Sequence, residues 1–137
     1  MDTGRILDHQ WVDDGPGWAA VEVSSAEEVL ALEPDFSGLP EAMVGVVGAR
    51  GRRGPGEAVY EVRAFAPGAG VAEDPVTGSL NASIGQWFLA RGDVPLPYTV
   101  SQGARVGRAG LLTVSHVEGA VWVGGAAITR IVGEVAM

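Results

Sequence analysis

The chain has 137 residues, a formal net charge of -8, 47% hydrophobic residues and no cysteine. This length suits one domain with a buried core, and the apolar content is typical of a folded protein. The negative charge argues against binding to nucleic acid or to an anionic membrane surface. Without cysteine the chain has neither disulfides nor a catalytic thiolate.

The first residues carry no targeting pattern. Residues 1–10 are polar apart from Ile6 and Leu7, so we expect a linker-like segment there and a domain over residues 11–137. No signal-peptide pattern is present, and no apolar run approaches the roughly 20 residues that a membrane-spanning helix needs. We therefore expect a cytoplasmic protein that does not contact membranes.

Two strands and a short helix are predicted before residue 50. Residues 18–24 alternate between apolar and polar, which predicts a strand. Residues 25–28 form a capping-box pattern, which predicts a short helix that ends at Pro34. The apolar run at residues 43–48 predicts a buried strand.

A basic loop and a third strand follow. The Gly-rich residues 50–56 predict a solvated hairpin tip, and attraction of an anionic ligand is the alternative. Residues 58–66 alternate, which predicts a strand with two different faces. One face carries Tyr60, Val62 and Ala64, and the other carries Val59, Glu61, Arg63 and Phe65.

The rest of the chain is organised around a polar turn, residues 73–79, and the helix that follows it. The apolar residues Leu80, Ile84, Trp87 and Phe88 recur at helical spacing, which predicts a helix over about residues 79–91 that Gly92 ends. Leu89 and Ala90 widen the apolar face, and close approach of another backbone would explain Gly85 within the helix.

The beginning of this helix is the candidate binding site. The first N–H groups of a helix have no partner inside it and carry about half a positive charge, so they attract a carboxylate or a phosphate. Thr77, Gly78 and Ser79 place only small groups there. The alternative is that the Thr77 or Ser79 side chain simply caps the helix.

Strands are predicted for the remainder. Residues 98–101 predict a short strand, and residues 105–116 and 120–131 predict two long antiparallel strands joined at Glu118-Gly119. The predicted fold class is α+β, with a curved mixed or antiparallel sheet wrapped around the central helix.

Several of these segments resemble one known family. Residues 63–67 and 70–79, together with residues 11–18, 102–103, 107–108 and 121–126, resemble the C-terminal half of PhzF-like (phenazine biosynthesis-like) isomerases and epimerases. The resemblance covers nearly the whole chain in family order. It implies half of a diaminopimelate-epimerase-like fold, which has two similar halves and a catalytic cleft between them.

The resemblance also implies a chemistry. The family transfers a proton on a small carboxylate substrate without a cofactor, and a Glu of the first half is the base. By position, Asp74 and Ser79 correspond to catalytic residues, and Thr77, Gly78 and Ser79 to substrate-binding residues. No metal site is expected, because His9 and His116 are isolated.

The base and the Gly-His-Pro-type stretch of the family's first half have no counterpart here, and Glu73 is the local alternative to the missing base. A complete cleft therefore needs a partner, either a second copy in a homodimer or a separately encoded N-terminal half. Whether the chain is an enzyme stays open. The alternatives are a non-catalytic module that binds small carboxylates and a degenerate half-domain. A second acid or base within reach of Asp74 would distinguish catalysis from binding.

Overall fold

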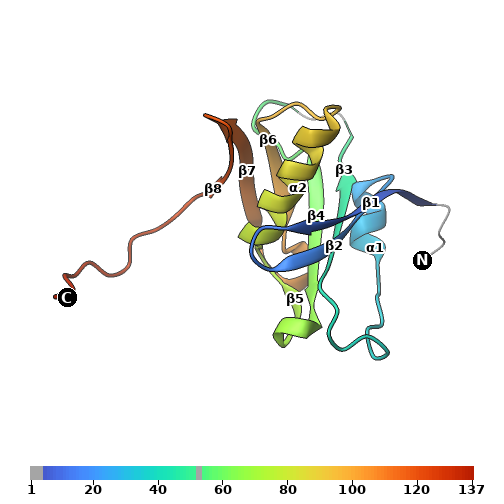
Figure 1. Ribbon diagram of the computed structural model, residues 1–137, viewed down its shortest axis with the longest axis horizontal. Helices are drawn as coiled ribbons and strands as arrows, with labels where there is room; N and C mark the ends of the chain where they lie inside the picture. Colours follow the sequence, from blue (N-terminus) through green and yellow to red (C-terminus); the bar gives the residue numbers. More distant parts are fainter. Residues whose placement is uncertain (1–4, 52–53) are drawn as a thin grey trace.

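The computed structural model describes residues 5–51 and 54–137 (Figure 1). Two residues of the predicted basic loop, 52 and 53, lie outside the described part. The helices are α1 (Ala26–Ala31) and α2 (Gly78–Arg91), with single 3₁₀ turns at Pro67–Ala69 and Ala104–Val106. The strands are β1 (Ile6–Asp13), β2 (Gly17–Val23), β3 (Val44–Ala49), β4 (Tyr60–Ala66), β5 (Val71–Asp74), β6 (Tyr98–Gln102), β7 (Gly110–Val117) and β8 (Ala120–Gly125).

The strands form one mixed sheet in the order β1-β2-β3-β4-β6-β7-β8, and β5 pairs with β4 beside this path. The pairs β2–β3 and β4–β6 are parallel, and the others are antiparallel. The sheet curves, and α2 lies in its hollow, where it packs against β1, β7 and β8 (Figure 1). The predicted α+β class, a curved mixed sheet around a central helix, is confirmed.

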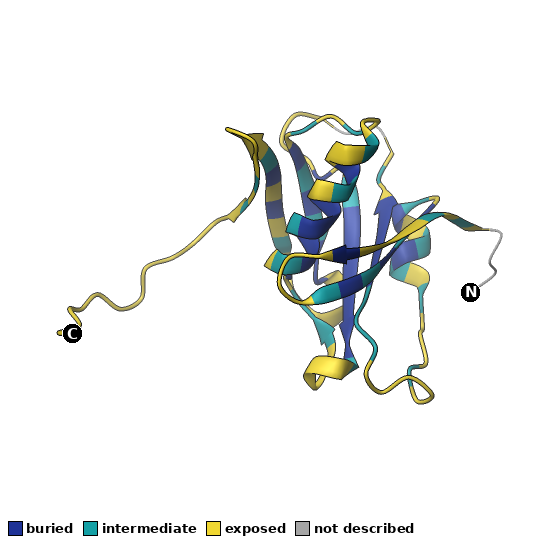
Figure 2. Cartoon of the chain, viewed as in Figure 1, coloured by how far each residue is buried: buried dark blue, intermediate teal, exposed yellow. Residues whose placement is uncertain are grey.

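The core lies between α2 and the concave face of the sheet (Figure 2). Leu80, Ile84 and Phe88 of α2 are at most 1% exposed, as the helical spacing of these apolar residues predicts. The two predicted faces of β4 are also confirmed. Val62 and Ala64 belong to this core, whereas Phe65 belongs to a smaller cluster with α1 on the other side of the sheet.

The first helix begins as its sequence predicts. Glu28 N–H donates to Ser25 Oγ at 3.2 Å, which caps α1. The Glu28 carboxylate accepts from the N–H and hydroxyl of Ser24, not from the N–H of Ser25 as in a regular capping box. The helix ends at Ala31, three residues before Pro34.

Both ends of the chain differ from the sequence-based expectation. Residues 6–10, expected in a linker-like segment, form the first part of β1, which pairs with β2. Because β1 is at the edge of the sheet, much of it is exposed. Its composition is therefore polar, and the apolar pattern that would predict a strand is missing.

At the other end, β8 ends at Gly125, and the expected strand up to residue 131 is wrong beyond that point. The turn at Glu118-Gly119 is confirmed, with φ angles of 51° and 81°. The segment 126–137 runs away from the domain in an irregular, exposed conformation, because no strand of the described chain pairs with it (Figures 1 and 2).

Candidate functional site

The candidate site lies where two strands meet end to end. β5 and β6 both pair with the same edge of β4, with Asp74 opposite Ala64 and Gln102 opposite Val62. Ala64 and Val62 are two positions apart, so the side chains of Asp74 and Gln102 share one face of the sheet, the face that carries α2. The turn that leads from β5 into α2 crosses this junction.

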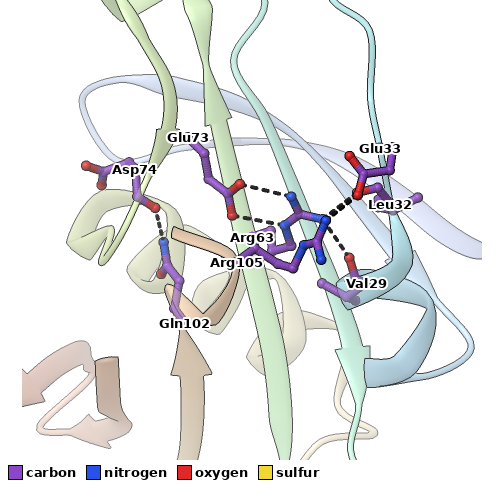
Figure 3. Close-up of polar contacts among 8 residues, drawn as sticks. All are labelled: Val29, Leu32, Glu33, Arg63, Glu73, Asp74, Gln102 and Arg105. Atoms are coloured by element: carbon purple, nitrogen blue, oxygen red, sulfur yellow. Dashed lines mark hydrogen bonds and ion pairs between the residues drawn. The ribbon is translucent and has the colours of Figure 1, made fainter. Parts of the chain in front are cut away.

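Gln102 holds the turn together. The side chain is buried, and its Nε2 donates to the Asp74 carbonyl oxygen at 3.0 Å and to Thr77 Oγ1 at 2.9 Å (Figure 3 shows the first bond). Its Oε1 accepts from Thr77 N at 3.1 Å and from Asn81 Nδ2 at 2.9 Å. Both donors and both acceptor positions of the amide are therefore used, which fixes the turn in one conformation.

The same network positions the Asp74 carboxylate. The buried Thr77 hydroxyl donates to Asp74 Oδ2 at 2.6 Å, and the Thr77 carbonyl oxygen accepts from Asn81 Nδ2 at 2.8 Å. Asp74 is only partly buried, and within the described part of the chain Thr77 supplies its one side-chain hydrogen bond. The carboxylate is thus held at one oxygen beside the first turn of α2.

The backbone at the start of α2 has no side-chain cap. Thr77 is the N-cap residue, but its hydroxyl bonds to Asp74 and Gln102 and not to the helix. The Ser79 hydroxyl accepts from Trp18 Nε1 at 3.2 Å. The prediction that Thr77 or Ser79 caps the helix with its side chain is therefore wrong. The N–H groups of Gly78 and Ser79, at an exposed and a half-buried position, stay free of intrahelical acceptors.

Glu73 lies on the other face of the sheet and is fully engaged. Arg63 Nε and Nη2 each donate to the Glu73 carboxylate at 2.9 Å, and Arg63 Nη1 donates to the carbonyl oxygens of Val29 and Leu32 (Figure 3). The side chains of Arg63 and Glu73 are 6% and 11% exposed. Because successive residues of β5 point to opposite faces, Glu73 is separated from Asp74 and is not available as the missing base.

Three residues of this region have roles that the sequence-based prediction missed: Asn81, Gln102 and Arg63. Asn81 follows Leu80 on the buried side of α2, and a polar residue within an apolar helix face signals a buried hydrogen bond. Gln102 and Arg63 carry the same signal within buried strands. Their partners lie 25 and 10 residues away along the chain, which the signal alone does not identify.

The histidines do not join the site. His9 on β1 and His116 on β7 are both exposed. Within the described residues, no group of three or more His, Asp or Glu side chains converges in a way that could hold a metal ion. None of the described helices is both long and apolar enough to cross a bilayer.

The geometry can therefore bind an anion at the start of α2, beside the carboxylate of Asp74. An anion at Gly78 and Ser79 would meet free N–H groups, the positive end of the helix dipole and the Ser79 hydroxyl. Asp74 lies beside that position and can accept a hydrogen bond or a proton. In the described residues no second acid or base is hydrogen bonded to Asp74, so Asp74 is the one carboxylate of this arrangement.

Sequence comparison assigns the chain to a family. The profile of the phenazine biosynthesis-like protein family (PhzC-PhzF) matches residues 2–133. Antisense-enhancing sequence 1 of Schizosaccharomyces pombe is 34% identical, over 90% of this chain and 45% of that protein. A protein of Escherichia coli named uncharacterized isomerase YddE is 32% identical, over 64% of this chain and 32% of that protein.

Solved structures share the fold. A PhzF-family phenazine biosynthesis protein of Bacillus anthracis superposes with a TM-score of 0.67 at 18% identity, over 88% of this chain and 46% of that one. A PhzF-family protein of Enterococcus faecalis gives 0.63 at 23% identity, over 90% and 48%. This chain thus spans half or less of the length of these relatives. It belongs to the phenazine biosynthesis-like (PhzC-PhzF) family.

Proposed function

We propose that the chain forms the substrate-holding half of a PhzF-like isomerase site, in the cytoplasm. The N–H groups of Gly78 and Ser79 bind the carboxylate of a small substrate, with Thr77 holding the turn beneath it. Asp74 and Ser79 contact the reacting part of the substrate. The observation that carries this proposal is the network around Gln102, which fixes Asp74 beside the uncapped start of α2.

The chemistry that fits this half is proton transfer without a cofactor. A base removes a proton next to the activated carbon, and the proton returns at another position of the same substrate, so nothing is gained or lost overall. The bound carboxylate is stabilised by the helix N–H groups, and Asp74 holds the polar part of the substrate in place. The base belongs to a second half, either another polypeptide or a second copy of this chain.

One observation favours a second candidate function. Glu73, the carboxylate next to Asp74 in sequence, is held by Arg63 on the opposite face and cannot take the role of the base. A chain that acts alone would therefore bind a small carboxylate without converting it.

A titration followed residue by residue tests the binding step. We expect benzoate to shift the backbone amide resonances of Gly78 and Ser79, and the neutral isostere benzamide to leave them unchanged. Ser79→Ala should weaken the benzoate response, whereas Ser115→Ala, a partly exposed serine on β7, should not. Equal shifts with benzoate and benzamide, or none at these two amides, would overturn the binding proposal.

Proton exchange separates the enzyme from the binder. With a panel of small carboxylates in D₂O, incorporation of deuterium next to the activated carbon would support the isomerase. We expect incorporation only when the second half is present, and Asp74→Asn should abolish it. Carboxylate binding without incorporation under any of these conditions would favour the binding module.

A further inference from the structure

The segment that follows β8 exposes more apolar surface than any other part of the described chain. Ile128, Ile131, Val132 and Val135 are between 75% and 91% exposed, and the segment leaves the domain without packing against it (Figures 1 and 2). Isolated exposed apolar residues are ordinary, but a run of β-branched residues within twelve positions indicates a surface that another protein covers.

The pattern within the segment is that of a strand with two unlike faces. In extended geometry, residues 129, 131, 133, 135 and 137 share one face, and this face carries Ile131 and Val135 without a charged residue. The opposite face carries the charged Arg130 and Glu134 together with Ile128 and Val132. Only the first face is free of charge, so it is the face that suits burial.

An acceptor for such a strand exists on the same molecule. β1 is the end strand of the sheet and pairs with β2 alone among the described strands, so its outer edge has no strand partner. Two backbone groups of β1 are bonded to exposed side chains instead: His9 N–H donates to Asp8 Oδ1, and the Trp11 carbonyl oxygen accepts from Gln10 Nε2. Beside this edge lies a groove of about 400 Å³ between β1 and α2. Residues 10–13 line it from the strand, and Ser83, Gln86, Trp87 and Ala90 line it from the helix.

The groove shows two signs of a missing neighbour. Ser83 is buried, yet its Oγ has no hydrogen-bond partner in the described part of the chain. Gln86 and Ala90 are exposed beside this groove, whereas Leu80, Ile84 and Phe88 on the sheet side of α2 are buried. A strand added to β1 would lay alternate side chains over this face of α2 and would narrow the opening between β1 and β8.

We propose that two copies of this chain exchange their segments 126–137, each of which pairs as a strand with the outer edge of β1 in the other copy. Ile131 and Val135 then lie in the groove, and Arg130 and Glu134 face water. Twelve extended residues reach about 40 Å at roughly 3.3 Å each, more than the eight residues of β1 require.

A second copy fits better than an unrelated partner because donor and acceptor are present on the same chain. A reciprocal exchange therefore satisfies both and closes with two-fold symmetry. The exchange does not depend on the ligand proposed for α2.

Light scattering of the full chain tests the exchange. We expect twice the 14.1 kDa mass of one chain at micromolar concentration, and one mass for the double variant Ile131→Asp with Val135→Asp. Ile128→Asp changes another exposed residue, on the opposite face, and should remain dimeric. A monomeric wild-type chain, or a dimeric double variant, would overturn the proposal.

Two further measurements keep the result interpretable. Ala90→Arg fills the groove from the exposed side of α2 and should also yield monomers, with an unchanged circular dichroism spectrum. A labelled peptide of residues 126–137 should bind a chain that lacks these residues, and Ala90→Arg in that chain should abolish binding. If removal of residues 126–137 lowers the melting temperature without changing the number of chains per particle, the segment folds back on its own domain, and the proposal is wrong. The benzoate titration of Gly78 and Ser79 is read out separately, so a failed exchange and a failed ligand site can be told apart.

Discussion

Gln102 and Thr77 are joined by two hydrogen bonds that run in opposite directions. The backbone N–H of Thr77 donates to Gln102 Oε1 at 3.1 Å, and Gln102 Nε2 donates to Thr77 Oγ1 at 2.9 Å. Because both residues are buried, neither bond is exchanged for one to water without opening the structure. The pair therefore fixes the backbone and the side chain of the turn together.

Removing the Gln102 amide tests this arrangement. Gln102→Leu removes the acceptor of the Thr77 N–H and one of the two acceptors of the Asn81 amide, and each unsatisfied buried group costs about 1–3 kcal/mol. We expect the free energy of unfolding in urea to fall by about 2–6 kcal/mol, since two such groups are affected. Gln86→Leu on the exposed side of α2 is the control and should change stability little. Equal effects of the two substitutions would show that the network does not stabilise the fold.

Neutralising one member of a buried ion pair should lower the free energy of unfolding more than neutralising one member of an exposed pair. Glu73→Gln leaves the buried Arg63 guanidinium without its counter-charge, and we expect a loss of about 3–5 kcal/mol in urea unfolding. Glu33→Gln breaks the pair with Arg105, which lies at the surface, and should cost at most about 1 kcal/mol.

A double variant separates charge from packing at the buried pair. Arg63→Met combined with Glu73→Leu removes both charges, so it should recover much of the stability that Glu73→Gln loses. A double variant less stable than Glu73→Gln would indicate that the bonds of Arg63 to the carbonyl oxygens of Val29 and Leu32 matter more than the ion pair.

Gly85 should resist replacement although it lies within a helix. A Cβ atom there would lie 2.6 Å from Val114 Cγ1 and 2.9 Å from Val121 Cγ1, so side chains, not another backbone as expected from the sequence, explain the glycine. Gly85→Ala gains about 1 kcal/mol of helix propensity, but overpacking costs about 1–3 kcal/mol, and we expect net destabilisation.

A double-mutant cycle checks the cause. Combined with Val114→Ala, Gly85→Ala should be less harmful than alone, because the methyl group that it meets is gone. Additive effects on thermal unfolding would mean that the contact with Val114 is not responsible.

Stability should depend on pH through Glu61. This residue is fully buried, its Oε2 pairs with Arg50, and its Oε1 has no hydrogen bond from the described residues. Burial raises the pKa of Glu61 more than the neighbouring Ser101 hydroxyl, Arg50 and Arg63 together lower it. The folded state therefore holds the proton more tightly than the unfolded state, so this contribution is complete at low pH and is lost as the pH rises through the raised pKa.

Glu61→Gln removes this titration. We expect the free energy of unfolding of the variant minus that of the wild type to increase as the pH rises above about 4. Glu41→Gln, at an exposed loop position, is the matched control. A flat difference for Glu61→Gln would contradict the raised pKa.

The sequence predicts the inner part of the fold well, because burial leaves a periodic pattern. The helical spacing of Leu80, Ile84 and Phe88 and the alternation in β4 each report which face is buried, and the structure agrees. The ends are predicted less well. β1 is exposed along much of its length, and the strand expected up to residue 131 has the composition of a strand but no neighbour to pair with.

The candidate site is predictable only in part. The turn and its position before α2 follow from Pro75, Gly78 and the apolar periodicity. The hydrogen bonds of the Thr77 hydroxyl do not follow from the local sequence, because one of them comes from Gln102, which lies 25 residues later on another strand. A local pattern predicts a helix cap at Thr77, and a tertiary contact overrides it.

The pairing of β5 and β6 with one edge of β4 also limits how this site can change in evolution. A Cβ atom at Gly103 would lie 2.6 Å from the Pro75 carbonyl oxygen, and one at Gly110 would lie 2.5 Å from Val76 Cγ2. Pro75 and Val76 are therefore packed so closely against the chain at Gly103 and Gly110 that neither glycine can be replaced without moving the turn. We expect new ligand preferences to arise by exchanging side chains at the positions of the turn that are not buried, Val76, Gly78 and Ser79.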